Sequence, residues 1–286
     1  MRQELIEIIT KDKVSLMGML FTPLDKSQKT VIHIHGLADN FYQRRFVREL
    51  AKMYASIGYN FLSFNTRGHD YATIIIKEDK SVRGGTYNEL LSDSLIDIEA
   101  VVGFVKDIGT EEIILEGHSL GCSKLINYYN ENKMPMITKI ILLAPSDGIT
   151  KFKQIMKDGY DYFYNMAKEL HGSERENEVL CNPDFFPQSF TAKVFIENFT
   201  EDGLADTFRY RDDTYVNPVL KSVEIPILIE VGTIDRMAFI AERDDITPYW
   251  NRNNDNYKLD FIVGADHEYV GLEEKLCDNI KKWLNN

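Results

Sequence analysis

The sequence predicts an α/β protein with a mostly parallel, doubly wound sheet of about eight strands and an antiparallel N-terminal hairpin. Two observations lead to this class. Short apolar runs typical of buried strands alternate along the chain with stretches of helical periodicity. A glycine-flanked turn, 117–121, lies between one such strand and one such helix. Alternation of this kind produces parallel strands joined by right-handed helical crossovers.

The first four strands come from the N-terminal part of the chain. Residues 4–10 and 14–22 surround a polar triplet and predict the hairpin. Residues 30–35 and 59–65 predict the next two strands. The helix between them, 44–56, is predicted from apolar residues at spacings of three and four, namely Phe46, Val47, Leu50, Met53 and Tyr54.

The other strands and helices continue the alternation. Apolar residues at helical spacing predict helices over 94–106 and 123–130. The four remaining strands are expected at 113–116, 139–143, 225–231 and 259–263.

The turn Gly117-His118-Ser119-Leu120-Gly121 is the strongest chemical signal in the chain. A G-x-S-x-G turn between strand and helix pushes the serine hydroxyl out above the sheet. We expect glycine at both flanking positions because the turn needs positive φ angles and leaves no room for a Cβ atom. A free serine hydroxyl is a weak nucleophile, so Ser119 needs a base and an orienting acid.

Both partners follow predicted strands later in the chain. Asp235 comes after 225–231, and His267 comes after 259–263. Ligands bind at the carboxyl ends of parallel strands, so all three side chains are expected at one edge. His267 is preferred as the general base over the other histidines because of this loop position, the competitors being His33, His35, His69, His118 and His171.

These residues give the chain a resemblance to a known family. His35-Gly36, Arg67-Gly68-His69, the 117–121 turn, Asp235 and Gly264-Ala265-Asp266-His267 resemble the motifs of α/β-hydrolase fold proteins, in the esterase and serine-peptidase-like branch. The resemblance covers most of the chain. It implies a Ser-His-Asp triad that works through an acyl-enzyme.

The remaining site residues are expectations within that fold. Backbone N–H groups of Leu37 and Leu120 are expected to form the oxyanion hole. Asp147 is the alternative acid, because some family members place the acid one strand earlier. His35 is expected to shape its turn and is also a candidate substrate contact, while Arg67 is expected to tie loops together.

Residues 150–223 interrupt the alternation and are rich in Phe and Tyr. In the family this is the position of a cap over the active site, which divides the chain into a core of 1–149 and 224–286 and an inserted helical cap of 150–223. Candidate substrate contacts in the cap are Tyr160, Phe163, Phe186 and Phe208. The alternative is that these aromatic side chains only pack the cap onto the core.

Composition excludes several other classes. A net charge of −12 disfavours a nucleic-acid partner. There is no metal-ligand spacing, nucleotide-binding motif, membrane-spanning run or signal peptide, so no cofactor, metal or membrane is expected. Three widely spaced cysteines favour reduced thiols and the cytoplasm.

The expected function is that of a cofactor-independent serine hydrolase acting on a carboxylic ester of a small or medium, partly apolar molecule. A thioesterase, lactonase, amidase or peptidase would use the same triad. A non-catalytic ligand-binding protein is the alternative from another class. The sequence leaves the oligomeric state open, a homodimer included.

Overall fold

The computed structural model describes residues 1–182, 186–201, 203–236 and 246–285, without the side chains of 158, 182 and 186–188. The strands are β1 (Arg2–Ile9), β2 (Val14–Thr22), β3 (Lys29–Ile34), β4 (Asn60–Phe64), β5 (Thr73–Lys77), β6 (Lys80–Gly84), β7 (Glu112–His118), β8 (Ile137–Leu143), β9 (Val179–Asn182), β10 (Phe186–Thr191), β11 (Ile227–Gly232) and β12 (Tyr257–Ile262). The helices are α1 (Arg45–Ser56), α2 (Leu91–Asp107), α3 (Leu120–Glu131), α4 (Gly148–Met156), α5 (Asp158–Leu170), α6 (Ala192–Phe199), α7 (Pro218–Lys221), α8 (Thr247–Asn253) and α9 (Glu273–Leu284).

Within the described residues, ten of these strands form one sheet in the order β12-β11-β8-β7-β3-β4-β2-β5-β6, with β1 paired to β2. The strands β12, β11, β8, β7, β3 and β4 run parallel to one another. The pairs β1–β2, β2–β4, β2–β5 and β5–β6 are antiparallel. The predicted α/β class with an antiparallel N-terminal hairpin is therefore confirmed.

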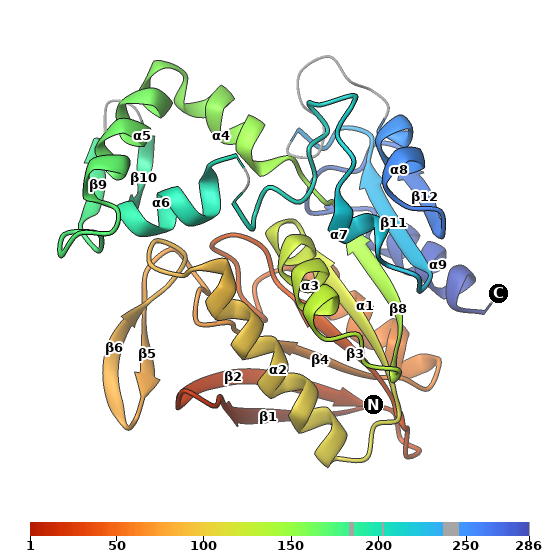
Figure 1. The fold of residues 1–286 in the computed structure, drawn as a ribbon. Coiled ribbons are helices and arrows are strands. Elements are labelled where there is room, and N and C mark those ends of the chain that lie inside the picture. Colours follow the sequence, from red (N-terminus) through yellow and green to blue (C-terminus); the bar gives the residue numbers. More distant parts are fainter. Residues whose placement is uncertain (183–185, 202, 237–245, 286) are drawn as a thin grey trace.

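Alternating side chains of the strands pack against helices on both faces of the sheet. On β3, Ile32 packs with residues of α2 and α3, whereas its neighbour Val31 packs with residues of α1 and α9. Figure 1 shows α2 and α3 in front of the sheet and α1 and α9 behind it. Helices on both faces leave the strand ends as the edge at which side chains from several loops can meet.

The hairpin of β5 and β6 was not expected from the sequence. The sequence feature that corresponds to it is the run Ile74-Ile75-Ile76. In the turn after this run, Glu78 and Asp79 have φ angles of 51° and 62°. Paired positive φ angles are typical of a tight hairpin turn, but Glu and Asp are not the Asn-Gly pair that usually marks one.

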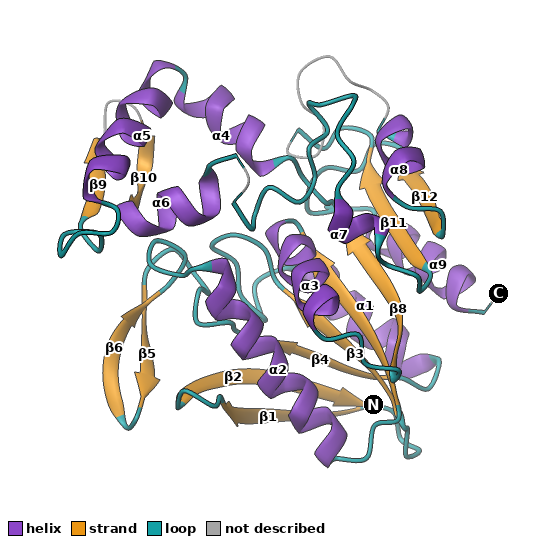
Figure 2. Ribbon diagram, in the orientation of Figure 1, coloured by secondary structure: helices purple, strands orange, loops and turns teal. Residues whose placement is uncertain are grey.

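The segment between β8 and β11 has a hydrophobic cluster of its own. Its α4, α5 and α6 and the β9–β10 hairpin lie above the sheet in the view of Figure 2. A third cluster of buried apolar residues runs from Ile149 to Phe199, separate from the two that line the sheet. Residues further along, including Phe208 and Val223, belong to the cluster in front of the sheet.

A cap over 150–223 therefore stays a prediction. The packing favours an earlier end for the separately packed unit, near Phe199, because the chain returns to the main core soon after it. The unit also contains a β-hairpin as well as helices.

Candidate active site

Ser119 lies at the sharp turn between β7 and α3, with φ 54° and ψ −120°. Such an angle is strained for a residue with a Cβ atom. Of the two reasons expected for the flanking glycines, only the lack of room for a Cβ atom holds, because neither glycine has a positive φ angle. A Cβ atom on Gly121 would lie 2.2 Å from the carbonyl oxygen of Ile34, and one on Gly117 would lie 2.5 Å from Leu125. The glycines therefore allow β7, α3 and β3 to approach closely.

Asp235 and His267 lie at the ends of two neighbouring parallel strands, β11 and β12. The Nδ1 atom of His267 is 2.9 Å from Oδ2 of Asp235 and 3.0 Å from Oδ1. Asp235 is fully buried, whereas the His267 side chain is partly exposed. An acid that holds Nδ1 leaves Nε2 as the free ring nitrogen of the base.

Gly232, the last residue of β11, makes this approach of the two loops sterically feasible. A Cβ atom there would lie 2.2 Å from the carbonyl oxygen of Ala265. The N–H of Ile234 donates to that same carbonyl at 3.0 Å. The loops that carry Asp235 and His267 are thus joined by their main chains as well as by the two side chains.

The loop of His267 also contacts the Ser119 turn. His118 precedes Ser119, and its Nε2 lies 2.8 Å from the backbone oxygen of His267. The two imidazole rings are 4.8 Å apart between centroids. The fold therefore brings the loops of all three predicted residues to one edge of the sheet. Sequence reasoning dismissed His118 and missed this contact.

The predicted oxyanion donors flank the same turn. Leu120 is the first residue of α3, directly after Ser119. On the other side, a Cβ atom on Gly36 would lie 3.0 Å from Cβ of Ser119, so the loop of Leu37 runs close to the serine. Ala38, with φ 52°, is held by a hydrogen bond from its N–H to Thr86 Oγ1 at 2.9 Å.

His35 is buried beneath this loop and is not placed to contact a substrate, which corrects that expectation. Its Nδ1 donates to the carbonyl of Gly36 at 2.9 Å, and its Nε2 accepts from the N–H of Thr66 at 3.1 Å. Burial, helped by the charge of Lys124, lowers the pKa of His35 well below its usual value. A neutral His35 with both ring nitrogens occupied supports the turn.

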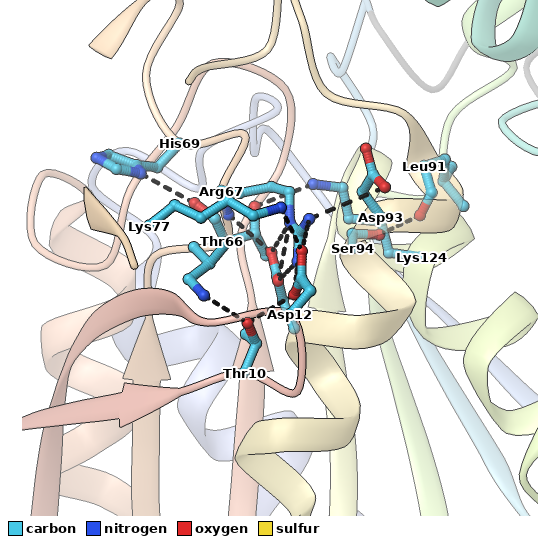
Figure 3. Close-up of polar contacts among 12 residues, drawn as sticks. Thr10, Asp12, Thr66, Arg67, His69, Lys77, Leu91, Asp93, Ser94 and Lys124 are labelled. Atoms are coloured by element: carbon cyan, nitrogen blue, oxygen red, sulfur yellow. Dashed lines mark hydrogen bonds and ion pairs between the residues drawn. The ribbon is translucent and has the colours of Figure 1, made fainter. Parts of the chain in front are cut away.

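Arg67 ties three parts of the chain together, as predicted. Figure 3 shows its guanidinium beside Asp12 in the turn after β1, and it also binds Asp97 of α2 at 2.7 Å. Burial raises the pKa of Asp97 to about 6, although its bonds to Arg67 act in the opposite direction. This cluster supports the base of the loop 65–70.

A second buried ion pair behind the Ser119 turn was not predicted. Lys124 of α3 is buried and binds Glu89 Oε2 at 2.6 Å and Thr66 Oγ1 at 3.2 Å. A Cβ atom on Gly68 would lie 1.9 Å from that carboxylate. In the sequence, Lys124 is a lysine among the apolar residues of a helix. Such a lysine ordinarily indicates an exposed side chain, so the sequence did not indicate a buried ion pair.

Asp147, the alternative acid, is occupied by other partners. Its Oδ1 accepts from the N–H of Thr150 at 3.0 Å, which caps α4, and from Arg211 at 2.8 Å. Its Oδ2 accepts from the N–H of Arg211 at 3.2 Å. Asp235, not Asp147, therefore has the hydrogen bond to His267.

The aromatic residues expected to line a pocket are packed into hydrophobic clusters. Tyr160 and Phe163 are buried in the cluster of α4 to α6, where the Tyr160 hydroxyl donates to the carbonyl of Phe199 at 3.0 Å. Phe208 is buried in the main core, 5.8 Å from Trp250 between ring centroids. The side chain of Phe186 lies outside the described residues. Of the three described side chains, Tyr160 and Phe163 thus pack within the inserted segment itself, and Phe208 alone packs against the core.

Neither a metal-binding cluster nor a membrane-spanning helix is found in the described part of the chain. No three or more His, Cys, Asp or Glu side chains are grouped there so that they could hold a metal ion. No helix there has the length and apolar character to cross a bilayer.

Known proteins resemble this chain over nearly its whole length. The Mycoplasma genitalium protein named "Putative esterase/lipase 3" is 23% identical over 292 residues, which cover 96% of this chain and 93% of that protein. Est1E of Butyrivibrio proteoclasticus, solved with ferulic acid bound, superposes with a TM-score of 0.66 at 20% identity, covering 98% of this chain and 97% of that one. The Pyrococcus furiosus esterase Pf2001 superposes with a TM-score of 0.64 at 22% identity, covering 99% and 91%.

The α/β hydrolase GrgF of Penicillium sp. sh18 superposes with a TM-score of 0.67 at 15% identity, covering 99% and 98%, and this likeness establishes the α/β-hydrolase fold that the motifs predicted. One family model, described as "Protein of unknown function (DUF1749)", matches residues 7–285. The chain therefore belongs to the DUF1749 family, and its fold is that of the α/β hydrolases.

Proposed function

We propose that this protein is a serine esterase with Ser119 as nucleophile, His267 as general base and Asp235 as the acid that orients it. The hydrogen bond of 2.9 Å between His267 and the buried Asp235 carries the proposal. It lies at the sheet edge that also holds the strained Ser119 turn, to which the His267 loop is bonded through His118.

The chemistry follows from the properties of these groups. His267 Nε2 takes the proton from Ser119 Oγ as that oxygen attacks the ester carbonyl. The backbone N–H groups of Leu37 and Leu120 bind the resulting oxyanion, and each such donor contributes about 3 kcal/mol to the transition state. His267 then passes its proton to the leaving alcohol, and water releases the acid from the acyl-enzyme by the same route.

An ester is favoured as the substrate class because the chain resembles proteins that are named esterases. Ferulic acid, bound in the related Est1E, adds hydroxycinnamate esters to the candidates. The triad itself does not select the leaving group, so thioesters, lactones and amides belong in the same assay. Cysteines 122, 181 and 277 form no disulfide, which supports our proposal that the protein works in the cytoplasm.

Labelling and turnover together test the proposal. Wild-type protein is treated with a fluorophosphonate probe and assayed on p-nitrophenyl esters, methyl ferulate, acyl thioesters, lactones and aminoacyl amides. We expect labelling of Ser119 and ester turnover, both lost in Ser119→Ala. The matched control is Ser92→Ala, which changes an exposed serine of α2 and should behave as wild type.

A folded wild-type protein that takes no label and cleaves no substrate would refute the enzyme proposal and favour a ligand-binding protein. Turnover of thioesters or amides in preference to esters would keep the triad and change the substrate class.

A further inference from the structure

The elbow residue His118 makes a contact that the triad mechanism does not use. It is the last residue of β7, its side chain is buried, and its Nε2 lies 2.8 Å from the backbone oxygen of His267, 149 residues away. A carbonyl oxygen can only accept, so Nε2 must carry the proton. The turn that holds the nucleophile therefore donates a hydrogen bond to the main chain of the predicted base.

From this geometry we propose that His118 is a positioning residue, which fixes the backbone of His267 so that its imidazole stays in reach of Ser119. The proposal rests on the esterase function proposed above.

Two of the bonds that hold His267 act on different parts of the residue. Asp235 binds the ring through Nδ1 and sets its rotation about the side-chain bonds. His118 binds the backbone oxygen and sets the position of the residue as a whole. The first bond cannot replace the second, because a ring can keep its contact to Asp235 while the loop moves away from the serine. A displacement of about 1 Å at a reacting group can slow an enzyme about 100-fold.

The surroundings of His118 keep it a neutral donor. The centroid of its ring is 4.9 Å from that of Phe46 and 4.8 Å from that of His267. Its Nδ1 is buried and has no hydrogen-bond partner among the described residues. Burial and the neighbouring His267 lower the pKa of His118 well below its usual value, with smaller contributions from His33 and Arg44.

Neutrality matters because His267 becomes positively charged in each catalytic cycle. A second charged ring at this distance would disfavour that state, whereas a neutral Nε2–H donor supplies the bond without the charge. An unpartnered Nδ1 is consistent with this assignment, since a neutral ring with its proton on Nε2 has a bare acceptor at Nδ1.

Two substitutions of similar length separate the hydrogen bond from the packing. His118→Gln keeps an N–H donor at the position of Nε2, and His118→Met fills the same space without a donor. Both are compared with wild type by thermal unfolding and by kcat and KM on the ester that wild type cleaves best. We expect His118→Met to lower kcat by about 100-fold with little change in KM, and His118→Gln to recover most of that loss.

Three results would overturn the proposal: His118→Met with the kcat of wild type, equal losses in both variants at equal stability, or a change confined to KM. If His118→Met does not fold, the comparison of His118→Gln with His118→Asn takes its place, because the shorter amide cannot reach the carbonyl and should lose the activity that Gln keeps.

A readout without turnover separates this proposal from the proposed function. In protein labelled with ¹⁵N, the Nε2 resonance of His118 should stay that of a protonated, non-titrating nitrogen from about pH 6 to about pH 9, in contact with His267. If the protein gives that spectrum but has no esterase activity, the hydrogen bond is present without a catalytic role. This result would refute both the positioning proposal and the proposed esterase function. A titrating or Nδ1-protonated ring in an active enzyme would overturn the positioning role alone.

Discussion

At the carboxyl edge of the sheet, polar side chains join loops that are far apart in the sequence, whereas between Ile149 and Phe199 aromatic side chains pack against each other. The edge depends on bonds such as His267 to Asp235 and Arg67 to Asp97. The second region depends on contacts such as the stack of Phe152 on Phe199, with ring centroids 4.4 Å apart. Directional bonds place atoms accurately, and apolar packing mainly supplies stability.

The difference between the two regions shows that a residue type alone does not identify a binding surface. The aromatic residues of the inserted segment were candidate substrate contacts in the sequence, yet Tyr160 and Phe163 are buried among other apolar side chains. Two histidines that competed with His267 for the role of base, His35 and His118, are likewise buried and support the loops of this edge. Changes in the edge should therefore alter rate, and changes in the inserted segment should alter stability.

The largest effect should come from the acid. Asp235→Asn removes the acceptor that holds His267 in the productive tautomer and should lower kcat by about four orders of magnitude, measured on the best ester. Asp147→Asn is the matched control, which should lower the melting temperature through α4 and Arg211 and leave kcat near wild type. The reverse pattern would assign the acid to Asp147.

A core substitution in the inserted segment should act on stability. Phe163→Ala removes a buried ring and should lower the free energy of unfolding by about 3–5 kcal/mol, measured by urea titration. KM for a short ester should not change, because the ring faces other apolar side chains. A raised KM for longer acyl chains at unchanged stability would restore the pocket interpretation.

A buried titratable group beneath the edge should make stability depend on pH. Burial raises the pKa of Glu230 on β11 to about 8, so the folded protein holds a proton that the unfolded chain releases near pH 4.5. The wild type therefore loses stability as the pH rises from about 4.5 to about 8, by up to about 1.4 kcal/mol for each pH unit within that window.

Glu230→Gln carries no titrating group and should gain stability over wild type across that window, measured as unfolding free energy at several pH values. The exposed Glu131→Gln is the control and should show no such trend. A stability difference that does not vary with pH would mean that Glu230 is ionised in the folded protein.

The smallest effect should come from Arg44, which binds Asp39 at 2.9 Å and also pairs with Glu268. It thus joins the loop after β3 to the loop of His267. Because Arg44 is partly exposed, a double-mutant cycle of Arg44→Gln and Glu268→Gln should give a coupling energy of about 0.5–1 kcal/mol in unfolding experiments. Strict additivity would mean that the two loops are not coupled through this pair.

Much of the fold could be predicted because strand and helix periodicities are local properties of the chain. The runs 30–35 and 113–116 and the helix 44–56 correspond to β3, β7 and α1. The β5–β6 hairpin was missed because its turn residues, Glu78 and Asp79, are unusual at positive φ angles. The positions of Ser119, Asp235 and His267 could be proposed because each lies in the turn or loop that follows a strand.

The sequence by itself determined the order of the central parallel strands and of the helices between them, the serine turn and the candidate acid and base, since motifs and periodicity are written in neighbouring residues. Only the tertiary structure decided that His267 binds Asp235 while Asp147 binds Arg211, that His118 binds the loop of the base, and that Lys124 pairs with Glu89 inside the molecule. Each of these contacts joins residues that lie 30 or more positions apart. Their partners are selected by the packing of whole helices and strands, which no local pattern specifies.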